Sequence, residues 1–427
     1  MTASIEAVKG KGIPGAQDAA ELFAHIRDLS FDGVGVSRES YGPTETACLE
    51  ALVEWARRHG IAAETDPAAN VVFSLPGQGS GAAVVCGSHV DSVPQGGNYD
   101  GLAGVIAGLL CLKRLKDEAV SLPHPVWVAA MRGEESAWFG KAYMGSSAIL
   151  GKLRPEDLEL RNKRSGRTLA EAMASVGADV DRIVAGRPMP WVEGVKAYVE
   201  LHIEQGPLMV ARKWPTAIVS GIRGNIRHNA VRCIGEAGHS GAVPRWLRKD
   251  AVFAVSDLLV RLDEHWRVLL ERGNDLVVTA GVMGTDPAEH AVSRIPGRVD
   301  FSFEVRSEST VTLEEFYRVM RVECDAVARQ RGVRFEFDRR IESAPATMDS
   351  KLVQALLDAS AELGLPAERV PSGAGHDAAL FANAGIPSAM IFIRNENGSH
   401  NPAEAMDLDD FMSGVELLYQ ALPRLGA

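Results

Sequence analysis

The sequence of 427 residues contains only five cysteines, scattered along the chain without a Cys-x-x-Cys pair. This pattern argues against a disulfide framework and against a thiolate zinc site, and it is typical of proteins kept in a reducing cytoplasm. Residues 1–15 contain no apolar stretch of the kind found in a signal peptide. We therefore predict a cytoplasmic protein.

Long hydrophobic runs are also missing. The longest, residues 102–112, is too short and too rich in glycine to span a membrane. The net charge of -11 argues against a nucleic-acid partner, which needs a clustered basic face. No Gly-x-Ser-x-Gly turn is present, which disfavours a serine hydrolase, and no glycine fingerprint for a dinucleotide follows a strand. We expect neither a membrane nor a nucleic acid as partner.

The length of the chain exceeds what one hydrophobic core usually organises, so two domains are expected. Residues 1–215 and 343–427 combine short buried strands with helices, which predicts an α/β catalytic domain with a mixed sheet. Residues 216–342 have a different texture, with the order β-α-β-β-α-β of a split βαβ sandwich. This order predicts an α+β, ferredoxin-like domain inserted into the α/β domain.

The rest of the chain is organised around residues 87–91, Gly-Ser-His-Val-Asp. An apolar run just before them predicts a buried strand over residues 82–87, which leaves His89 at the carboxyl edge of the sheet. Asp100 follows before a helix rich in small residues. Imidazole and carboxylate together suit zinc, manganese or cobalt, and Asp91 can bond the other ring nitrogen of His89. Taken alone, this pattern also fits a surface histidine beside loop aspartates.

Three further predicted strands carry candidate ligands: Glu134 and Glu135 after residues 125–131, His202 within residues 195–207, and His400 after residues 387–393. Each of these features has a plain alternative when it is considered alone, such as a loop with two surface acids. On the strand of His202, Glu200 and Glu204 share the face of the histidine by period-two spacing. Such a face is costly in a core unless it coordinates something.

The candidates suggest a particular chemistry if the strand ends meet at one edge. Five ligands are too many for one catalytic zinc ion, which usually takes three ligands and a water. They suit two metal ions about 3.5 Å apart that share one carboxylate, with water between them. Asp100 is the best bridge because it lies at a junction between loop and helix. Glu134, next to a ligand, is then free to act as general base for that water.

The chain resembles the M20 metallopeptidase/amidohydrolase superfamily, in its hydantoinase/carbamoylase branch. This branch holds N-carbamoyl-L-amino acid amidohydrolases, allantoate amidohydrolases and β-ureidopropionases. The resemblance covers nearly the whole chain, and the run Leu-His-Ile-Glu-Gln-Gly-Pro at residues 201–207 marks the branch against the peptidases of the superfamily. The other motifs lie at residues 87–93, 98–101, 134–135, 238–241, 295–297 and 399–402.

The resemblance implies a role for each residue of the site. One metal takes His89, Asp100 and His202, the other takes Asp100, Glu135 and His400, and Glu134 is the base. His239, on the inserted lid domain, polarises the scissile carbonyl, and Arg306 holds a substrate carboxylate. The two divalent ions are zinc, manganese, cobalt or nickel, since this ligand set accepts each of them. Relatives pair through the lid, so a homodimer is implied, in which His239 could act across the dimer.

Some positions depart from the pattern of the relatives and concern the substrate. Ser293 stands where many relatives carry an asparagine that would contact substrate, and Asn225 lies in the altered lid strand. Arg394 precedes the last ligand, where it could bind a carboxylate or be a rim charge. For His376 and Asp377, in a glycine-rich turn, the simpler account is that Asp377 is the N-cap of a helix.

We therefore predict a binuclear amidohydrolase that cleaves a C–N bond of a linear ureido or N-carbamoyl amino acid with metal-activated water. The substrate is a small molecule that bears a carboxylate. The alternative is an aminoacylase or metallopeptidase of the same superfamily, which would share the metal ligands and differ in the pocket. A metal-dependent binding protein without turnover is a further class, but Glu134 and His239 argue against it, because binding alone needs neither.

Overall fold

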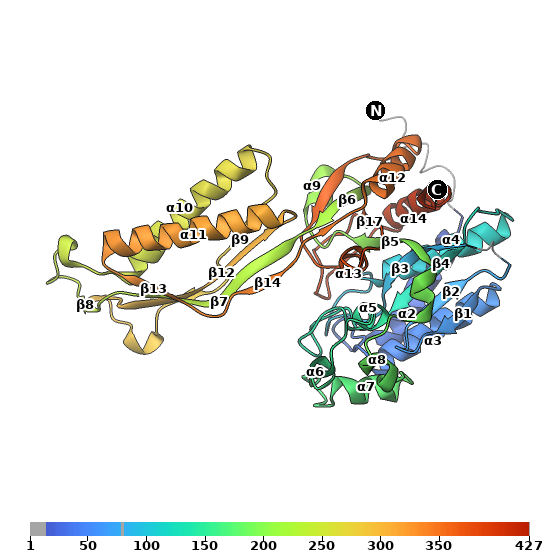
Figure 1. Cartoon of the computed structure of the whole chain (residues 1–427), viewed down its shortest axis with the longest axis horizontal. Coiled ribbons are helices and arrows are strands. Elements are labelled where there is room, and N and C mark those ends of the chain that lie inside the picture. Colours follow the sequence, from blue (N-terminus) through green and yellow to red (C-terminus); the bar gives the residue numbers. More distant parts are fainter. Residues whose placement is uncertain (1–13, 78–80, 427) are drawn as a thin grey trace. The chain divides into compact units, whose positions relative to one another are not determined.

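The structure is a computed structural model that describes residues 14–77 and 81–426 (Figure 1). The prediction about the first 15 residues therefore falls mostly outside the described ranges. The chain forms two compact units. The larger unit comprises the described residues up to Ser220 and from Thr347 onward, and the inserted unit comprises Gly221–Ala346. Within the described ranges, no helix combines the length and the apolar character that crossing a membrane requires.

The larger unit is built on a nine-stranded mixed sheet in the order β1-β2-β4-β3-β5-β17-β6-β15, with β16 beside β6. Four neighbours, β4, β3, β5 and β17, run parallel, whereas β2 and β6 run antiparallel to the strands next to them. The strands are β1 (Ala62–Thr65), β2 (Val71–Ser74), β3 (Ala83–His89), β4 (Val126–Met131), β5 (Val195–Ile203), β6 (Thr216–Ile222), β15 (Ala346–Thr347), β16 (Arg369–Ser372) and β17 (Ser388–Ile393). The predicted mixed-sheet α/β fold is confirmed.

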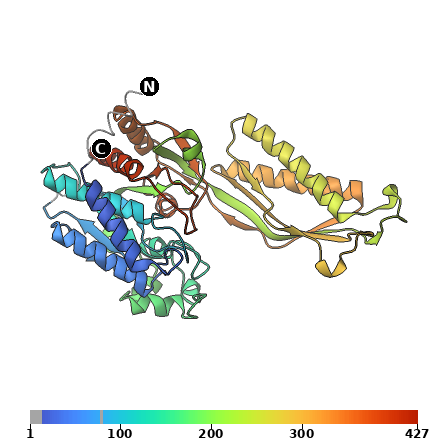
Figure 2. The same cartoon turned by 180° about the vertical axis from the view of Figure 1, so that it is seen from behind.

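Helices cover both faces of this sheet, and Figure 2 shows α2 and α3 in blue on the near side. The glycine-rich α4 packs closely on the sheet, because a Cβ at Gly104 would lie 2.2 Å from the carbonyl oxygen of Leu201 on β5. The helices are α2 (Ala16–Ser30), α3 (Pro43–Arg58), α4 (Leu102–Asp117), α5 (Met144–Ile149), α6 (Pro155–Leu158), α7 (Leu169–Ser175), α8 (Val180–Val184), α9 (Leu208–Arg212), α12 (Ser350–Glu362), α13 (Asp377–Ala382) and α14 (Leu408–Leu425).

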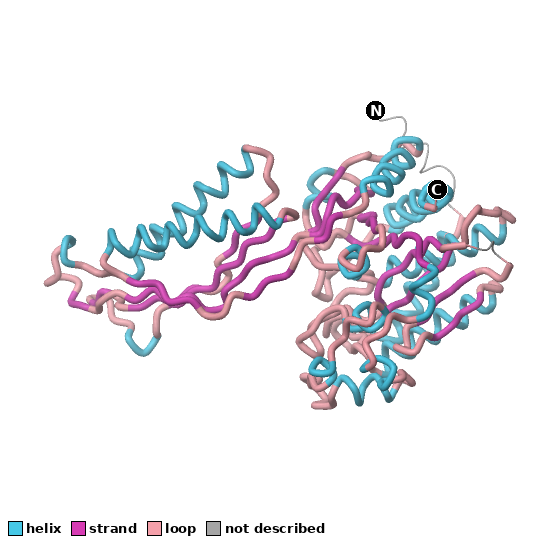
Figure 3. Tube along the Cα trace, viewed as in Figure 1, coloured by secondary structure: helices cyan, strands magenta, loops and turns pink. Residues whose placement is uncertain are grey.

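The inserted unit is an antiparallel sheet in the order β10-β12-β7-β13, with β14 beside β7 and β9 beside β12. Figure 3 shows these strands in magenta and the two long helices in cyan. The chain order β7, α10, β9, β12, α11, β13 matches the predicted β-α-β-β-α-β pattern. The elements are β7 (Gly224–Ile234), β8 (Gly238–His239), α10 (Ala251–Glu271), β9 (Val277–Thr279), β10 (Met283–Gly284), β11 (Arg294–Ile295), β12 (Arg298–Ser307), α11 (Thr310–Arg331), β13 (Arg334–Phe337) and β14 (Ile341–Ser343).

Binary patterning explains why the inserted sheet has one covered face. Along β12, Val299, Phe301, Phe303 and Val305 are buried, while the residues between them are not. The buried set packs with the apolar faces of α10 and α11, including Leu258 and Phe316, in a single core. The other face of the sheet carries the polar alternates, among them Arg306. The sequence is therefore apolar toward the helices and polar away from them.

The prediction that the organising strand stops at Gly87 is wrong, because β3 continues through His89. Gly87 has a φ of +145°, and a Cβ there would lie 2.0 Å from the carbonyl oxygen of Ala129 on β4. The glycine thus allows β3 and β4 to approach closely, and it does not break the strand. Pairing extends past the strand end, since the backbone amide of Val90 donates to the carbonyl of Met131 at 2.9 Å.

Candidate metal centre

The four parallel strands at the middle of the larger sheet end at the same edge, and each brings one or two of the predicted ligands to it. His89 closes β3 and His202 lies near the end of β5, while Glu135 follows β4 and His400 follows β17. Asp100 precedes α4 on the connection from β3. The structure therefore brings all five predicted ligands to one place. They form two groups of potential metal ligands that have Asp100 in common.

The first group consists of His89, Asp100 and His202, and it is closed to solvent. The Oδ1 atom of Asp100 lies 3.4 Å from Nε2 of His89 and 3.2 Å from Nε2 of His202. The exposed fraction of each of the three side chains is 5% or less. Burial by itself raises the pKa of the Asp100 carboxyl, but hydrogen bonds from His202 and His89 outweigh it and hold that pKa well below its usual range.

The second group uses the other oxygen of the same carboxylate. The Oδ2 atom of Asp100 lies 3.5 Å from Nε2 of His400, which is 3.3 Å from Oε1 of Glu135. His400 has a left-handed backbone with a φ of +61° and a side chain that is 52% exposed. The second group therefore faces solvent on one side, as a site that must admit a substrate does.

The ring orientations and the free oxygen fit divalent metal ions. Nδ1 of His202 lies 2.8 Å from the backbone oxygen of Ile203, and Nδ1 of His89 lies 3.1 Å from that of Asp91. Each ring can thus hold its proton on Nδ1 and present Nε2 as an acceptor, and Nε2 of His202 already accepts the backbone amide of Gly101 at 3.2 Å. A metal ion would replace this hydrogen bond. The buried Oε1 of Glu135 makes no hydrogen bond among the described residues. The nearest polar neighbour of that oxygen is Nε2 of His400, at 3.3 Å. Imidazoles, a shared carboxylate and a second carboxylate are suitable donors for zinc, manganese or cobalt.

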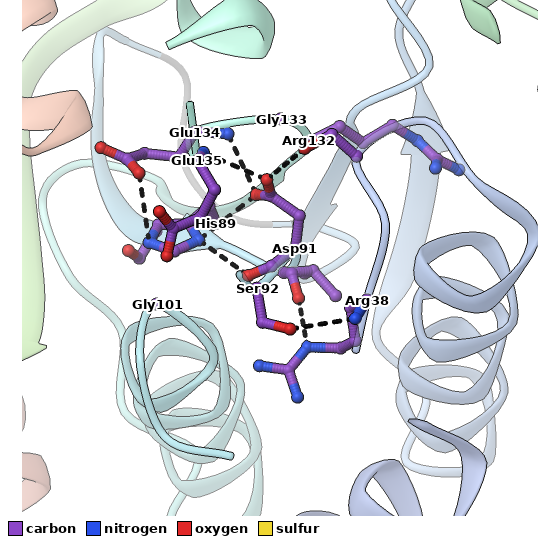
Figure 4. Close-up of polar contacts among 12 residues, drawn as sticks. Arg38, His89, Asp91, Ser92, Gly101, Arg132, Gly133, Glu134 and Glu135 are labelled. Atoms are coloured by element: carbon purple, nitrogen blue, oxygen red, sulfur yellow. Dashed lines mark hydrogen bonds and ion pairs between the residues drawn. The ribbon is translucent and has the colours of Figure 1, made fainter. Parts of the chain in front are cut away.

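Asp91 connects the loop after β3 to the loop after β4. Its carboxylate accepts the backbone amides of Glu134 at 3.0 Å and Glu135 at 3.1 Å, and the hydroxyl of Ser40 at 2.6 Å. Its Oδ1 also lies 3.3 Å from Nδ1 of His89. One fully buried aspartate thus orients a histidine of the first group and both adjacent glutamates, as Figure 4 shows.

Glu134 is set apart from the ligand groups but close to them. Its Oε2 lies 4.0 Å from Nε2 of His89, and Figure 4 shows its carboxylate directed toward that ring. Burial raises the pKa of Glu134 well above its usual value, the positive charge of His89 opposes this, and the charge of Glu135 adds to it. A buried carboxyl beside the ligand groups is placed to accept and return a proton.

Three residues that hold Asp100 were not singled out from the sequence. Gln205 Nε2 donates to Oδ2 of Asp100 at 2.7 Å, and the hydroxyl of Ser399 donates to the same oxygen at 2.5 Å. Glu404 accepts the backbone amides of Tyr99 at 2.9 Å and Asp100 at 3.3 Å. The only indication in the sequence that these two residues belong to the site is their position: Gln205 lies in the branch-specific run, and Ser399 precedes the ligand His400. Glu404 had none.

The strand β5 does not present three polar groups to the site, as period-two spacing suggested. Glu200 and His202 share a buried face, whereas Glu204 follows the strand and accepts the backbone amides of Leu208 and Met209 at 2.9 Å each. Glu204 thus holds the start of α9. Glu200 accepts the hydroxyl of Ser88 at 2.6 Å.

Asp377 is not the N-cap of α13, so that prediction is wrong. His376 occupies the cap position, without a capping hydrogen bond from its side chain. Glu200 instead accepts the backbone amide of Ala378 at 2.8 Å. Asp377 accepts the hydroxyl of Ser146 at 2.5 Å, and its other oxygen is buried without a hydrogen bond in the described structure. The ring of His376 packs edge-on against His202, with centroids 4.5 Å apart, so this turn supports the first ligand group.

The candidate substrate residues of the inserted unit form two pairs. Asn225 and Arg306 are directly opposite each other in the β7–β12 ladder, so their side chains share the polar face of the sheet. His239 belongs to β8 and pairs with Arg294, and the backbone amide of Ser240 donates to the carbonyl of Ser293 at 2.8 Å. His239 and Ser293 are exposed, whereas Asn225 and Arg306 are partly buried.

The remaining candidate for a substrate contact, Arg394, lies in the larger unit after β17. Its Nε donates to Oδ2 of Asp410 on α14 at 2.6 Å. The guanidinium is therefore already engaged in an ion pair that joins the loop to a helix. A contact with substrate would have to be made in addition to this pair.

Comparisons with known proteins agree with this arrangement. Residues 85–424 match the model of peptidase family M20/M25/M40. An N-carbamoyl-L-amino acid amidohydrolase of Geobacillus stearothermophilus is 35% identical over 92% of this chain and 93% of its own. An allantoate amidohydrolase of Escherichia coli is 30% identical over 92% of this chain and 93% of its own.

Solved structures show the same architecture. The crystal structure of an amidase of the hydantoinase/carbamoylase family from Burkholderia multivorans superposes with a TM-score of 0.85 at 27% identity, over 96% of this chain and 98% of that one. At 96% coverage, the match includes most of the residues of each unit. The chain belongs to peptidase family M20/M25/M40, in its hydantoinase/carbamoylase branch, and is a hydrolase of the amidohydrolase type.

Proposed function

We propose that the protein is a binuclear metal-dependent amidohydrolase that cleaves a C–N bond of a linear ureido or N-carbamoyl amino acid. The observation that carries this proposal is the position of Asp100. Its two oxygens face two different ligand groups, at 3.2–3.5 Å from three histidine nitrogens. A carboxylate shared in this way is the bridge that a two-metal hydrolase requires.

Each of the two ligand groups is assigned one metal ion. His89, Asp100 and His202 would hold one ion, and Asp100, Glu135 and His400 would hold the other. When bound, such ions polarise a carbonyl and make a water acidic enough to lose its proton near neutral pH. Zinc, manganese, cobalt and nickel all suit these donors.

Glu134 handles the proton in the proposed reaction. Its carboxylate takes a proton from the attacking water and returns it to the leaving nitrogen when the C–N bond breaks. The position of Glu134 supports this role, because it is buried beside His89 yet is not a member of either ligand group. Asp91 accepts the backbone amide of Glu134, and this hydrogen bond keeps the Glu134 carboxylate directed toward the site.

The substrate carboxylate is assigned to Arg306, with Asn225 beside it. A guanidinium binds a carboxylate through two parallel hydrogen bonds, and few other side chains can do so. Nε and Nη2 of Arg306 donate to the two oxygens of Glu304 at 3.0 and 3.1 Å, which holds the side chain on the polar face of the sheet. A substrate carboxylate would therefore displace Glu304 or bind the other edge of the guanidinium. Asn225 follows β6 of the larger sheet by only three residues, so the pair stays near the start of the inserted unit.

His239 and Ser293 lie beyond the other end of β7. From Asn225 to Ile234 the strand advances nine residues, which is about 30 Å at the usual rise per residue. A small substrate held by Arg306 therefore cannot also touch His239 of the same chain. We infer that the protein is a homodimer through the inserted unit, in which His239 and Ser293 serve the partner's metal centre. There His239 would donate to the oxyanion that forms at the carbonyl.

The test of the proposed function is ammonia release from a panel of substrates by chelator-treated protein, with and without added manganese or zinc. The panel contains N-carbamoyl-L-amino acids, N-carbamoyl-β-alanine, allantoate, ureidoglycolate and simple N-acyl amino acids. We expect metal-restored ammonia release from at least one ureido compound. Amino acid release from the N-acyl compounds alone would instead identify an aminoacylase and contradict the proposal.

A further inference from the structure

Among the described residues, Arg38 is the largest side chain that is fully buried, with an exposed fraction of 0%. It lies in the connection from α2 to α3, within residues 36–41, which we call the brace segment. This segment runs beside the connection from β3 to α4, where His89 and Asp100 lie. Val36 and Gly96 exchange two backbone hydrogen bonds of 2.9 and 2.8 Å. The backbone amide of Arg38 donates to the hydroxyl oxygen of Ser92 at 2.9 Å, and the backbone amide of Ser92 donates to the carbonyl of Arg38 at 3.0 Å.

The guanidinium of Arg38 holds both ends of that connection. Its Nε donates to the carbonyl oxygen of Val90 at 2.5 Å, directly after His89. Its Nη1 donates to Oδ1 of Asn98 at 3.2 Å, two residues before Asp100. One rigid, planar group thus fixes the backbone beside a histidine ligand and beside the shared carboxylate. The distance between those two ligands depends on the loop that it spans.

Ser40 gives the brace segment a second route to the same site. Its hydroxyl donates to Oδ2 of Asp91 at 2.6 Å. Asp91 in turn contacts Nδ1 of His89 and the amides of both adjacent glutamates. Figure 4 shows Arg38 below the loop of Asp91 and Ser92, with His89 and Glu134 above it.

The burial of Arg38 is costly for the stability of the fold. Its Nη2 has no hydrogen-bond acceptor among the described residues, and no carboxylate lies within ion-pair distance of the guanidinium in that part of the chain. Burial lowers its pKa, against the more distant negative charges of Glu404, Asp91 and Asp100. Because an apolar side chain of similar volume would usually serve a core at least as well, stability alone does not account for an arginine here.

We propose that Arg38 and Ser40 are positioning residues of the metal centre: they fix the spacing of His89 and Asp100 and thereby set how tightly the first ligand group holds its ion. Arg38 acts through the Val90 carbonyl and Asn98, and Ser40 acts through Asp91. This inference rests on the metal centre of the proposed function and assigns it a support outside the ligands themselves. Partners of ligands in this position commonly change metal affinity when they are removed.

The experiment measures metal binding and not turnover. Apo protein is titrated with cobalt in competition with a chromophoric chelator, and the cobalt absorption bands report the ligand geometry. The variants are Arg38→Met, Arg38→Lys and Ser40→Ala. The control is Arg114→Met, which removes a partly buried arginine of the larger unit that is paired with Glu118 and Glu416 away from the ligands. All proteins are first compared by circular dichroism and thermal unfolding.

We expect Arg38→Met to weaken the tighter cobalt site about 10- to 100-fold and to change its spectrum. Arg38→Lys should lie between this variant and the wild type, because it keeps the charge but cannot reach both acceptors. Ser40→Ala should show a smaller loss, about 10-fold or less, since Asp91 keeps its other donors. The Arg114→Met protein should bind cobalt like the wild type.

Two results would overturn the inference in distinguishable ways. If Ser40→Ala and Arg38→Lys are folded and bind cobalt with wild-type affinity and spectrum, the positioning role is wrong while the metal centre stands. If the wild type itself binds no cobalt, the proposed metal centre is wrong and the inference falls with it. Should Arg38→Met fail to fold, the two milder variants decide the question.

Discussion

The two units hold their polar site residues in opposite ways. In the larger unit, His89, Asp100 and His202 are at most 3% exposed, and each has a defined partner besides the ligand atoms. In the inserted unit, His239 and Ser293 are exposed and lie a full strand away from Arg306. The comparison indicates that the candidate metal ligands are held together within the larger unit, whereas the candidate substrate residues of the inserted unit lie far apart. Under the proposed function, a second chain would complete the substrate site.

Metal removal should have the largest effect, and it should act on the larger unit. Because the ligand groups lie only in the larger unit, chelation should abolish hydrolysis and lower the unfolding temperature of that unit, as loss of a bound ligand does. Activity assays with and without restored manganese, together with calorimetry, measure both effects. Full activity in protein shown by elemental analysis to lack metal would contradict the account.

Glu134→Gln tests the proton transfer within the preorganised region. We expect kcat to fall about 10²- to 10⁴-fold, which is the usual contribution of a general base, with metal content unchanged. The control is Glu204→Gln, because Glu204 only holds the start of α9. Wild-type turnover by the Glu134→Gln enzyme would show that another group accepts the proton.

Arg306→Ala tests the pair of Asn225 and Arg306, which lies at the start of the inserted unit. Loss of a charged hydrogen-bonding partner should raise KM for a carboxylate-bearing substrate by about 10- to 100-fold and leave metal binding unaffected. Arg306→Lys should recover only part of the loss, since an ammonium cannot form the paired contact. Arg298→Ala, at the far end of the same strand, is the matched control. An unchanged KM in Arg306→Ala would remove the carboxylate role.

Arg394→Ala is expected to have the smallest effect. Its guanidinium is paired with Asp410, so its loss should cost about 1 kcal/mol of stability or less, with little change in KM. Asp410→Asn breaks the same pair from the other side, and comparing the unfolding of the two variants separates structure from binding. A KM increase in Arg394→Ala that is absent from Asp410→Asn would show a substrate contact.

The gathering of the five candidate ligands follows from a local rule that sequence can express. His89, Glu135, His202 and His400 each lie at or just after the carboxyl end of a buried apolar strand, and such ends meet at one edge when the strands are parallel neighbours. The alternation along residues 298–306 likewise predicted the half-covered sheet of the inserted unit. Whether the five residues bind metal in the proposed way stays a prediction.

The supports of the site could not be predicted, because they depend on contacts between distant parts of the chain. Glu404 accepts the amide of Tyr99 across 305 residues, and Arg38 reaches Asn98 across 60. Nothing in the local pattern around either residue indicates such a partner. The Asp377 prediction failed for the same reason, since Glu200 on β5 accepts the amide that a cap residue would have bonded.

The central claim, that the site combines the metal centre of one subunit with His239 of another, is tested by mixing two inactive variants. Glu134→Gln and His239→Ala are mixed under conditions that let subunits exchange, and hydrolysis of the identified substrate is measured. The account predicts recovery to about a quarter of wild-type activity, because half of the dimers become mixed and each of these has one intact site. No recovery, despite subunit exchange shown by mass spectrometry, would contradict it.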